Sequence, residues 1–403
     1  DRSEARIGTL LTLRGSNFGR IRRGSRVVFP VSGGAACEPC TSDVMYAFWD
    51  DTSITVRVPA GAVSGFVTVV TPWGASNPVR ISVERPAGSM VAGEPAEIGL
   101  RYGARIAEIA TRETPEDGEP AGRRDIVLRL PRVSTSESQR DIRYLDDQPV
   151  EFRFERVSAD FEREVIRTVL VDRYEMRSEI DPARVSAAYE SETGFFEYYT
   201  RRLPDAPVDD ERVRQIAAQL RSGRGSPYRI AEAAYVATLD ALTYALGRAD
   251  RSASAGLGSG YGDDFTYATL FVTLSRAALV PARAVGGVLV TTTGEAYPHF
   301  WAEFFVTGIG WIPVDPALGD GAFPAGFPVP EDPRVFYFGN LDNRRVAFGR
   351  GYDALEPTFL DGIRVEPEDP YTLQRSYAEG GALVESFRLT WFRPRVIGFY
   401  ASN

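Results

Sequence analysis

The first part of the chain is a succession of short apolar runs. Each run is rich in β-branched residues and is bounded by Gly, Pro, Asn or Asp, which is typical of strands joined by turns. The clearest runs cover residues 10–13, 25–29, 54–58, 65–70 and 79–83. Residues 1–86 are therefore predicted to form an all-β domain.

A second β-rich segment follows a linker at residues 84–89. Its clearest apolar runs cover residues 126–131, 150–154 and 165–171, and they have the length and composition of strands. We expect residues 97–180 to form a second β domain.

Helical periodicity begins after residue 181. Val213, Ile216 and Leu220 repeat at helical spacing, and Ser226 before Pro227 is a typical helix start. The second of these helices is predicted to run to about residue 246.

The most regular helical pattern covers residues 263–276, with two acidic residues, Asp263 and Asp264, at the end where negative charge is favoured. Its apolar residues share one face: Tyr267, Leu270, Phe271, Leu274 and Ala278. Short β-prone runs follow at residues 284–290, 300–306 and 311–314. We expect an α+β core over residues 181–330, and a C-terminal β extension over residues 331–403 that packs on this core.

Charge and composition narrow the function classes. The chain of 403 residues has a net charge of −9 and a pI near 5.1, which argues against nucleic acid and anionic membranes as main partners. No apolar run is long enough to span a bilayer. All 46 basic residues are arginine, so the chain has no lysine amine to donate to a crosslink.

Five separated motifs occur in one order within residues 258–316. They are a glycine turn, an aromatic-Ala-x-Leu-Phe helix, a Val-Pro-Ala-Arg strand, a His-x-Trp strand and a Gly-Trp-x-x-x-Asp strand, at residues 258–262, 267–271, 280–283, 299–301 and 310–315. This order and spacing resembles the core of the transglutaminase-like superfamily, which implies a papain-like α+β fold. The resemblance also implies a β-sandwich ahead of this core, at residues 97–180.

The sequence departs from that family at the catalytic position. The family's cysteine falls on Asp264, its histidine on His299 and its aspartate on Asp315. The family's reaction needs a thiolate, and a carboxylate is a poor nucleophile toward amides. The resemblance therefore implies an inactive relative with a static Asp-His-Asp network and no cofactor.

The N-terminal module also carries a resemblance. Its Gly15-Ser-Asn-Phe-Gly19, Ile54-Thr-Val-Arg-Val-Pro59 and Gly74-Ala-Ser-Asn77 segments are similar to those of the IPT/TIG immunoglobulin-like domains. That family implies a spacer or interaction unit on an exported protein. Its members have a further strand before the position of Ile7, so we expect an open β edge here, suited to self-assembly or to a partner strand.

Cys37 and Cys40 are the only cysteines. A short-loop disulfide in an exported protein is the preferred interpretation. A redox pair needs a strand-to-helix context, and a zinc site needs two further ligands, while the only histidine already belongs to the transglutaminase-like motif. We therefore expect a periplasmic, cell-surface or extracellular location.

Three functions remain open for the chain. The preferred one is a catalytically inactive transglutaminase-like protein of the bacterial envelope or exterior, which binds a protein or polysaccharide of the cell surface. The second is a hydrolase in which Asp264, His299 and Asp315 hold a divalent metal or activate water. The third is a structural subunit of a surface layer or filament.

Trp301, Glu303 and Trp311 are further candidates for a binding surface beside the cleft. Aromatic side chains stack on sugars or peptide side chains, but tryptophans on strands more often pack in the core. Glu303 shares strand parity with His299, and if buried it needs Arg283 or Arg276 as a partner.

Overall fold

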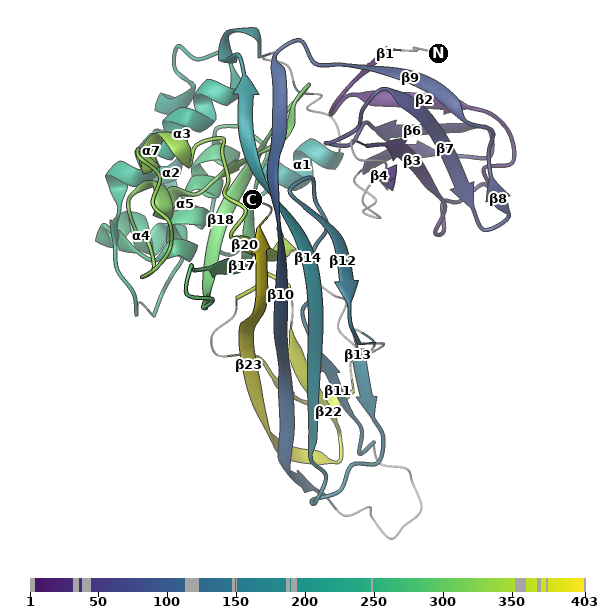
Figure 1. The fold of residues 1–403 in the computed structure, drawn as a ribbon, viewed down its shortest axis with the longest axis vertical. Coiled ribbons are helices and arrows are strands. Elements are labelled where there is room, and N and C mark those ends of the chain that lie inside the picture. The colour runs from purple at the N-terminus through teal and green to yellow at the C-terminus, as the bar shows by residue number, and fades with distance from the viewer. Residues whose placement is uncertain are drawn as a thin grey trace.

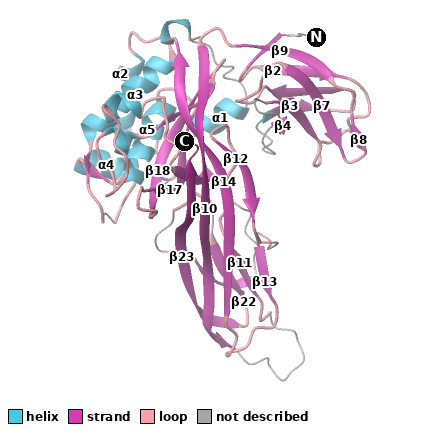
Figure 2. Cartoon of the chain, viewed as in Figure 1, coloured by secondary structure: helices cyan, strands magenta, loops and turns pink. Residues whose placement is uncertain are grey.

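The computed structural model describes residues 4–31, 36–37, 45–112, 123–146, 149, 151–185, 189, 194–247, 249–351, 360–367, 371–374 and 376–401. The chain forms an N-terminal β domain, a long β-sandwich and a helix-rich core beside the upper end of that sandwich (Figure 1). Strands dominate, and the helices gather in the core (Figure 2). No helix within the described ranges has the length and apolar character needed to cross a membrane.

The N-terminal domain consists of two sheets around one apolar core. The first sheet contains β1 (Glu4–Arg6), β9 (Val79–Glu84), β7 (Gly65–Thr71), β3 (Arg26–Pro30) and β4 (Ala36–Cys37), with β8 (Gly74–Ala75) paired to β7. The second contains β2 (Leu10–Arg14), β6 (Ser53–Arg57) and β5 (Tyr46–Trp49). Ile54 and Val56 of β6 are fully buried, as strand alternation requires. The all-β prediction is therefore met, while membership of the immunoglobulin-like class stays a prediction.

The edge that we expected to be open is occupied. β1 pairs in parallel with β9, with Glu4 opposite Ser82 and Arg6 opposite Glu84. The chain itself thus supplies the strand that hydrogen-bonds to β9. The reason for expecting a partner strand at this edge is removed.

The sandwich is built on two long antiparallel strands. β10 (Gly88–Thr111) pairs with β14 (Arg163–Ile180) along almost its whole length. Its first sheet has the order β12 (Gln139–Tyr144), β14, β10, β23 (Val384–Ala401), and its second has the order β13 (Glu151–Phe154), β11 (Ile126–Arg129), β22 (Tyr377–Gly381), β21 (Asp361–Val365). Alternate residues of β10, from Ile98 to Ile106, are buried between the two sheets.

The C-terminal strands differ from our expectation. We expected residues 331–403 to extend the core, but only β20 (Arg345–Arg350) joins the core sheet. β23 pairs with β10 from Ala96 opposite Ala401 to Thr111 opposite Val384, and β21 and β22 complete the other sheet. The sandwich is thus completed by the end of the chain, because residues 88–180 supply only β10 to β14 of its two sheets.

The core places helices on one side of a four-stranded antiparallel sheet. The sheet order is β19 (Gly310–Val314), β18 (Ala296–Val306), β17 (Ala282–Val290), β20. The helices are α1 (Gly194–Thr200), α2 (Glu211–Arg221), α3 (Pro227–Ala241), α4 (Ala253–Ser259), α5 (Asp264–Ala277), α6 (Pro316–Gly319) and α7 (Pro333–Phe336), with a 3-10 turn at Pro182–Arg184. α5 is buried over nearly its whole length between the sheet and the other helices.

α3 ends earlier than the predicted residue 246. Leu242 adopts an extended backbone at its C-terminus. The chain then forms β15 (Thr243–Tyr244), which pairs in parallel with β16 (Tyr261–Gly262) directly before α5. This pairing brings the segment after α3 against the start of α5.

The domains share apolar surface. Phe305 and Phe195 of the core are buried in the same cluster as Val56 and Val58 of the N-terminal domain. Val288 and Phe348 of the core sheet are buried with the interior of the sandwich. The core sheet therefore contacts both β domains.

Replacing Gly287 tests the core sheet. A Cβ added there would lie 2.0 Å from the carbonyl oxygen of Val346 on β20, so that the two strands must separate. We expect Gly287→Ala to lower the free energy of unfolding by about 2 kcal/mol or more. Gly258→Ala is the matched control, because a Cβ there meets nothing within 4 Å. Equal midpoints of thermal unfolding for the two variants would contradict this account of the sheet.

Candidate functional site

The site begins at the N-terminus of α5. Asp263 is the N-cap and accepts a hydrogen bond from the backbone N–H of Thr266 at 3.0 Å. Asp264 is the first helical residue, where the helix dipole favours a carboxylate. It is only 7% exposed.

Both carboxylate oxygens of Asp264 are engaged. Oδ2 accepts the backbone N–H of Phe300 at 2.9 Å and lies 3.3 Å from His299 Nδ1. Oδ1 lies 3.5 Å from the guanidinium of Arg251, which also pairs with Asp263. The carboxylate therefore ties the start of α5 to β18 and to the segment before α4.

The other nitrogen of His299 faces Asp315. His299 Nε2 lies 2.8 Å from Asp315 Oδ2, and Asp315 is also the N-cap of α6, accepting the N–H of Leu318 at 3.1 Å. The three residues that the motifs placed together thus meet in the order Asp264, His299, Asp315. The structure brings them from a helix start, a central strand and a second helix start.

This arrangement fixes the charge of the imidazole. A neutral imidazole has one N–H and would turn a lone pair toward one of the two carboxylates, whereas the imidazolium donates to both. Burial disfavours the charged form, but Asp315 and Asp264 outweigh it and raise the pKa of His299 to about 9. Burial likewise tends to raise the pKa of Asp315, and His299 and Arg345 together hold it below its usual value.

Charges alternate outward from the histidine on both sides. Arg345, fully buried on β20, donates to Asp315 Oδ2 from Nη1 at 2.7 Å and also pairs with Asp342. On the other side Arg251 pairs with Asp264 and Asp263. We name this set the charge chain; it consists of Asp342, Arg345, Asp315, His299, Asp264, Arg251 and Asp263. Every charge in it lies beside an opposite one, which offsets the cost of burial.

Sequence reasoning missed the two arginines of the charge chain. Arg345 begins a run whose pattern predicts only an apolar strand. Its proximity to Asp315 depends on the pairing of β20 with β17, which the sequence does not show. Arg251 lies in a Gly-, Ser- and Ala-rich segment without a periodic pattern. The one available signal was a basic residue close in sequence to the acidic helix start.

Arg251 covers the outer side of Asp264. Its side chain is 31% exposed, compared with 10% for that of Asp264. Its guanidinium lies over the rings of Phe265 and Phe300, at 4.9 and 5.6 Å from their centroids. The position beside the Asp264 carboxylate is thus filled by the chain's own side chain.

The two tryptophans and the glutamate do not form a surface beside Asp264. Trp301 is fully buried, with its ring stacked 6.2 Å from that of His299. Trp311 packs against Tyr199 and Phe305, with the guanidinium of Arg283 3.8 Å from its centroid. Both rings therefore pack within the protein, as tryptophans on strands more often do, and this contact set gives no support to the alternative of a binding surface.

Glu303 is buried in an ion-paired cluster. It accepts from Arg283 Nε at 2.8 Å and also pairs with Arg350, which we had not predicted. Arg276, the other expected partner, donates instead to the carbonyl of Ala282. Burial tends to raise the pKa of Glu303, but the two arginines hold it below its usual value. Glu303 therefore joins β17, β18 and β20 rather than facing a ligand.

The arrangement of the charge chain does not suit a metal. Asp264 and Asp315 lie on opposite sides of the imidazole, and each ring nitrogen already faces a carboxylate. Within the part of the chain that the structure describes, no group of three or more His, Cys, Asp or Glu side chains could hold a metal ion.

The predicted disulfide is not tested. The backbone of Cys37 belongs to β4 in the N-terminal domain. Cys40 lies outside the described residues. The pairing of these two cysteines stays a prediction.

Comparison with known proteins agrees with this geometry. Residues 214–316 match the model of the Transglutaminase-like superfamily, and this range contains Asp264, His299 and Asp315. The chain thus has a transglutaminase-like core within a mostly β multidomain structure. A search of curated proteins gives no match.

Two solved structures are distantly similar to the chain. A putative cysteine protease from Cytophaga hutchinsonii has 13% identity and a TM-score of 0.47, with 78% of this chain and 93% of that chain covered. The periplasmic domain of TgpA from Pseudomonas aeruginosa has 17% identity and a TM-score of 0.30, with 58% of this chain and 94% of that chain covered. Neither similarity bears on the activity of this chain.

The charge of His299 predicts a pH dependence of stability. Its folded pKa of about 9 lies above the ordinary value of 6.5, so the stabilisation is complete below about pH 6.5 and is lost as the pH rises through about 9. We expect the free energy of unfolding to fall by about 3 kcal/mol over this rise in pH. Glu137, whose pKa burial raises to about 7, completes its own titration largely below the upper part of this window.

The measurement is the free energy of unfolding by urea between pH 6 and pH 10. His299→Gln is the control, because it removes the only histidine and should flatten the curve in this window relative to the wild type. Parallel curves for the two proteins would contradict the assignment of a charged His299.

Proposed function

We propose that the transglutaminase-like core has lost acyl-transfer chemistry and that the protein acts by binding or assembly at the bacterial envelope or exterior. The observation that carries the proposal is the complete engagement of Asp264, whose two carboxylate oxygens face His299, the backbone N–H of Phe300 and Arg251. A carboxylate held in this way is stabilised as an anion and is a poor nucleophile toward a substrate carbonyl.

The histidine supports the same conclusion. In a thiol enzyme of this kind the imidazole takes a proton from the nucleophile and later returns it to the leaving group. An imidazolium flanked by Asp264 and Asp315 has no free basic nitrogen at neutral pH. A hydrolase that uses His299 to activate water would face the same obstacle.

Arg251 adds a steric argument. A substrate that approached Asp264 from the outer side would have to displace a guanidinium that is held by two carboxylates and lies over two aromatic rings. Displacement would leave Asp263 and Asp264 partly unpaired in a buried place, which is unfavourable.

The β domains supply the surfaces for the proposed binding role. The N-terminal domain carries Trp73, whose side chain is 80% exposed, at the β7–β8 hairpin. The predicted immunoglobulin-like class and the predicted Cys37–Cys40 disulfide are the grounds for proposing an exported location.

The test is an assay of the wild type and four variants, among them His299→Asn alone, for incorporation of a labelled amine into a glutamine-containing substrate, for deamidation and for peptide cleavage. We expect no activity from the wild type and measurable activity from Asp264→Cys, because a thiolate beside His299 recreates the ion pair that the chemistry needs. Asp264→Asn is the matched control without a nucleophile, and Asp264→Cys combined with His299→Asn should be inactive. The chain has no lysine, so self-crosslinking through its own amines does not complicate the readout.

Wild-type activity that disappears in His299→Asn would overturn the proposal. Activity in Asp264→Asn equal to that in Asp264→Cys would show that a different group performs the reaction.

A further inference from the structure

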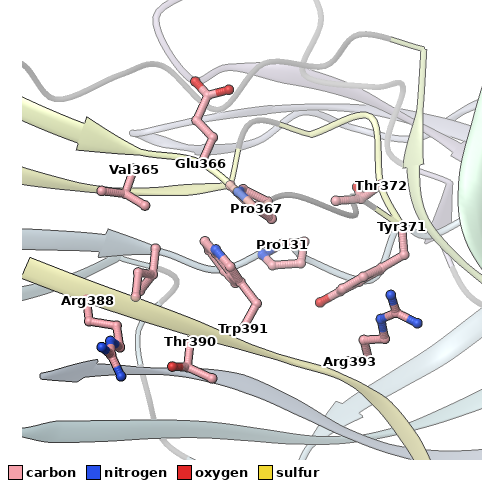
Figure 3. Close-up of a pocket in the computed structure, with 12 residues that line it drawn as sticks. Pro131, Val365, Glu366, Pro367, Tyr371, Thr372, Arg388, Thr390, Trp391 and Arg393 are labelled. Atoms are coloured by element: carbon pink, nitrogen blue, oxygen red, sulfur yellow. The ribbon is translucent and has the colours of Figure 1, made fainter. Parts of the chain in front are cut away.

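A cavity opens in the sandwich, away from the charge chain. It has a volume of about 390 Å³ and lies between β23 of one sheet and, in the other, the end of β21 and residues that follow it before β22. Figure 3 shows the rings of Trp391, Tyr371, Pro131 and Pro367 around it. This volume is in the range of sites that take small molecules.

Two polar atoms at this cavity are buried without a partner. Trp391 Nε1 and Ser376 Oγ have no hydrogen-bond partner among the described residues, although both residues line the cavity. Ser376 is only 6% exposed. Buried donors and acceptors are nearly always paired, so a molecule with hydroxyl groups in the cavity would satisfy both once the Trp391 and Ser376 side chains turn toward it.

The ring surfaces indicate the shape of that molecule. The face of an aromatic ring is negative and attracts the C–H bonds of a flat, saturated ring. A sugar ring has such a C–H face and a rim of hydroxyl groups, and the cavity offers aromatic faces beside unpaired polar atoms. The side chains of Thr372 and Thr390 line the same space.

The charged side chains at the rim of the cavity indicate which kind of sugar fits it. Arg388 and Arg393, both exposed, line the cavity together with one acidic residue, Glu366. Arg393 is two residues from Trp391 on β23 and lies beside Tyr371 (Figure 3). Arg388 pairs with Glu108 at 2.8 Å, but both side chains are more than half exposed and such pairs contribute little. Arginine is suited to carboxylate groups because its planar donors match their geometry.

We propose that this cavity binds a sugar ring that carries a carboxylate, as in a uronic acid unit of a polysaccharide. The ring stacks on Trp391, its hydroxyl groups bond to Trp391 Nε1 and Ser376 Oγ, and its carboxylate meets Arg393. This inference does not depend on the chemistry at Asp264, because the cavity lies in the sandwich.

The test is a titration of the full chain, labelled with ¹⁵N at tryptophan, with digalacturonic acid. The chain has five tryptophans, and Trp391→Phe identifies the indole N–H signal of Trp391 by its loss. We expect a saturable shift of that signal, and binding of the neutral disaccharide cellobiose that is weaker by about tenfold or more.

Two variants locate the contacts. Arg393→Gln should weaken digalacturonate binding by about tenfold or more and remove the preference over cellobiose. Ser376→Ala should weaken the binding of both sugars by about threefold or more. It should not lower the stability of the protein, since the Ser376 hydroxyl is unpaired in the free protein. Arg395→Gln is the matched control, because Arg395 is exposed on the same strand and does not line the cavity, and its affinity should equal that of the wild type.

Several results would overturn the proposal. One is the absence of a saturable shift with digalacturonate by about 10 mM. Others are an equal shift with sodium acetate, equal affinity for cellobiose, or unchanged affinity in both Arg393→Gln and Ser376→Ala. A shift produced by a proline-rich peptide and by neither sugar would assign the cavity to peptide recognition instead.

Discussion

A buried imidazole held between two carboxylates is the constraint on which the core of this protein depends. His299 lies on β18, Asp264 starts α5 and Asp315 starts α6, so the hydrogen bonds of one ring join three elements. Arg345 brings in β20 as a fourth element. Transfer of each of these ions from water into the protein interior costs several kcal/mol. The alternation of positive and negative residues in the charge chain offsets this cost. Removal of any one member would leave its neighbours buried and uncompensated.

If the core has lost acyl-transfer chemistry, as we propose, the same arrangement explains how its geometry persists. A thiol at the position of Asp264 would alternate between neutral and charged forms as the histidine takes and returns a proton. The Asp264 carboxylate, together with Asp315, raises the pKa of His299 and also pairs with Arg251. The site is thus a structural element that fixes the start of α5. In the proposed function, binding belongs to other surfaces, such as the exposed hairpin of the N-terminal domain and the cavity in the sandwich.

The sequence predicted those features that depend on local spacing. The helical repeat from Tyr267 to Leu274 predicted α5, because an α-helix has a fixed period. The resemblance of the motifs to the transglutaminase-like core then placed Asp264, His299 and Asp315 together. The sequence did not predict contacts between distant segments. The pairing of β23 with β10 joins residues 96–111 to residues 384–401, and no local pattern indicates it. Arg345 and Arg251 were missed for the same reason, and Trp301 was taken for a possible ligand surface because alternation gives the side of a strand but not what covers it.

The most direct test of the account is the state of the imidazole itself. His299 is the only histidine, so its ring signals can be followed in ¹⁵N-histidine-labelled protein by NMR without further assignment. At pH 7.5 the account predicts that both ring nitrogens carry a proton, and that the ring loses its charge only as the pH rises through about 9. A neutral ring at pH 7.5, with one protonated nitrogen and a pKa at or below the ordinary value, would contradict it, since such a ring could still serve as a general base.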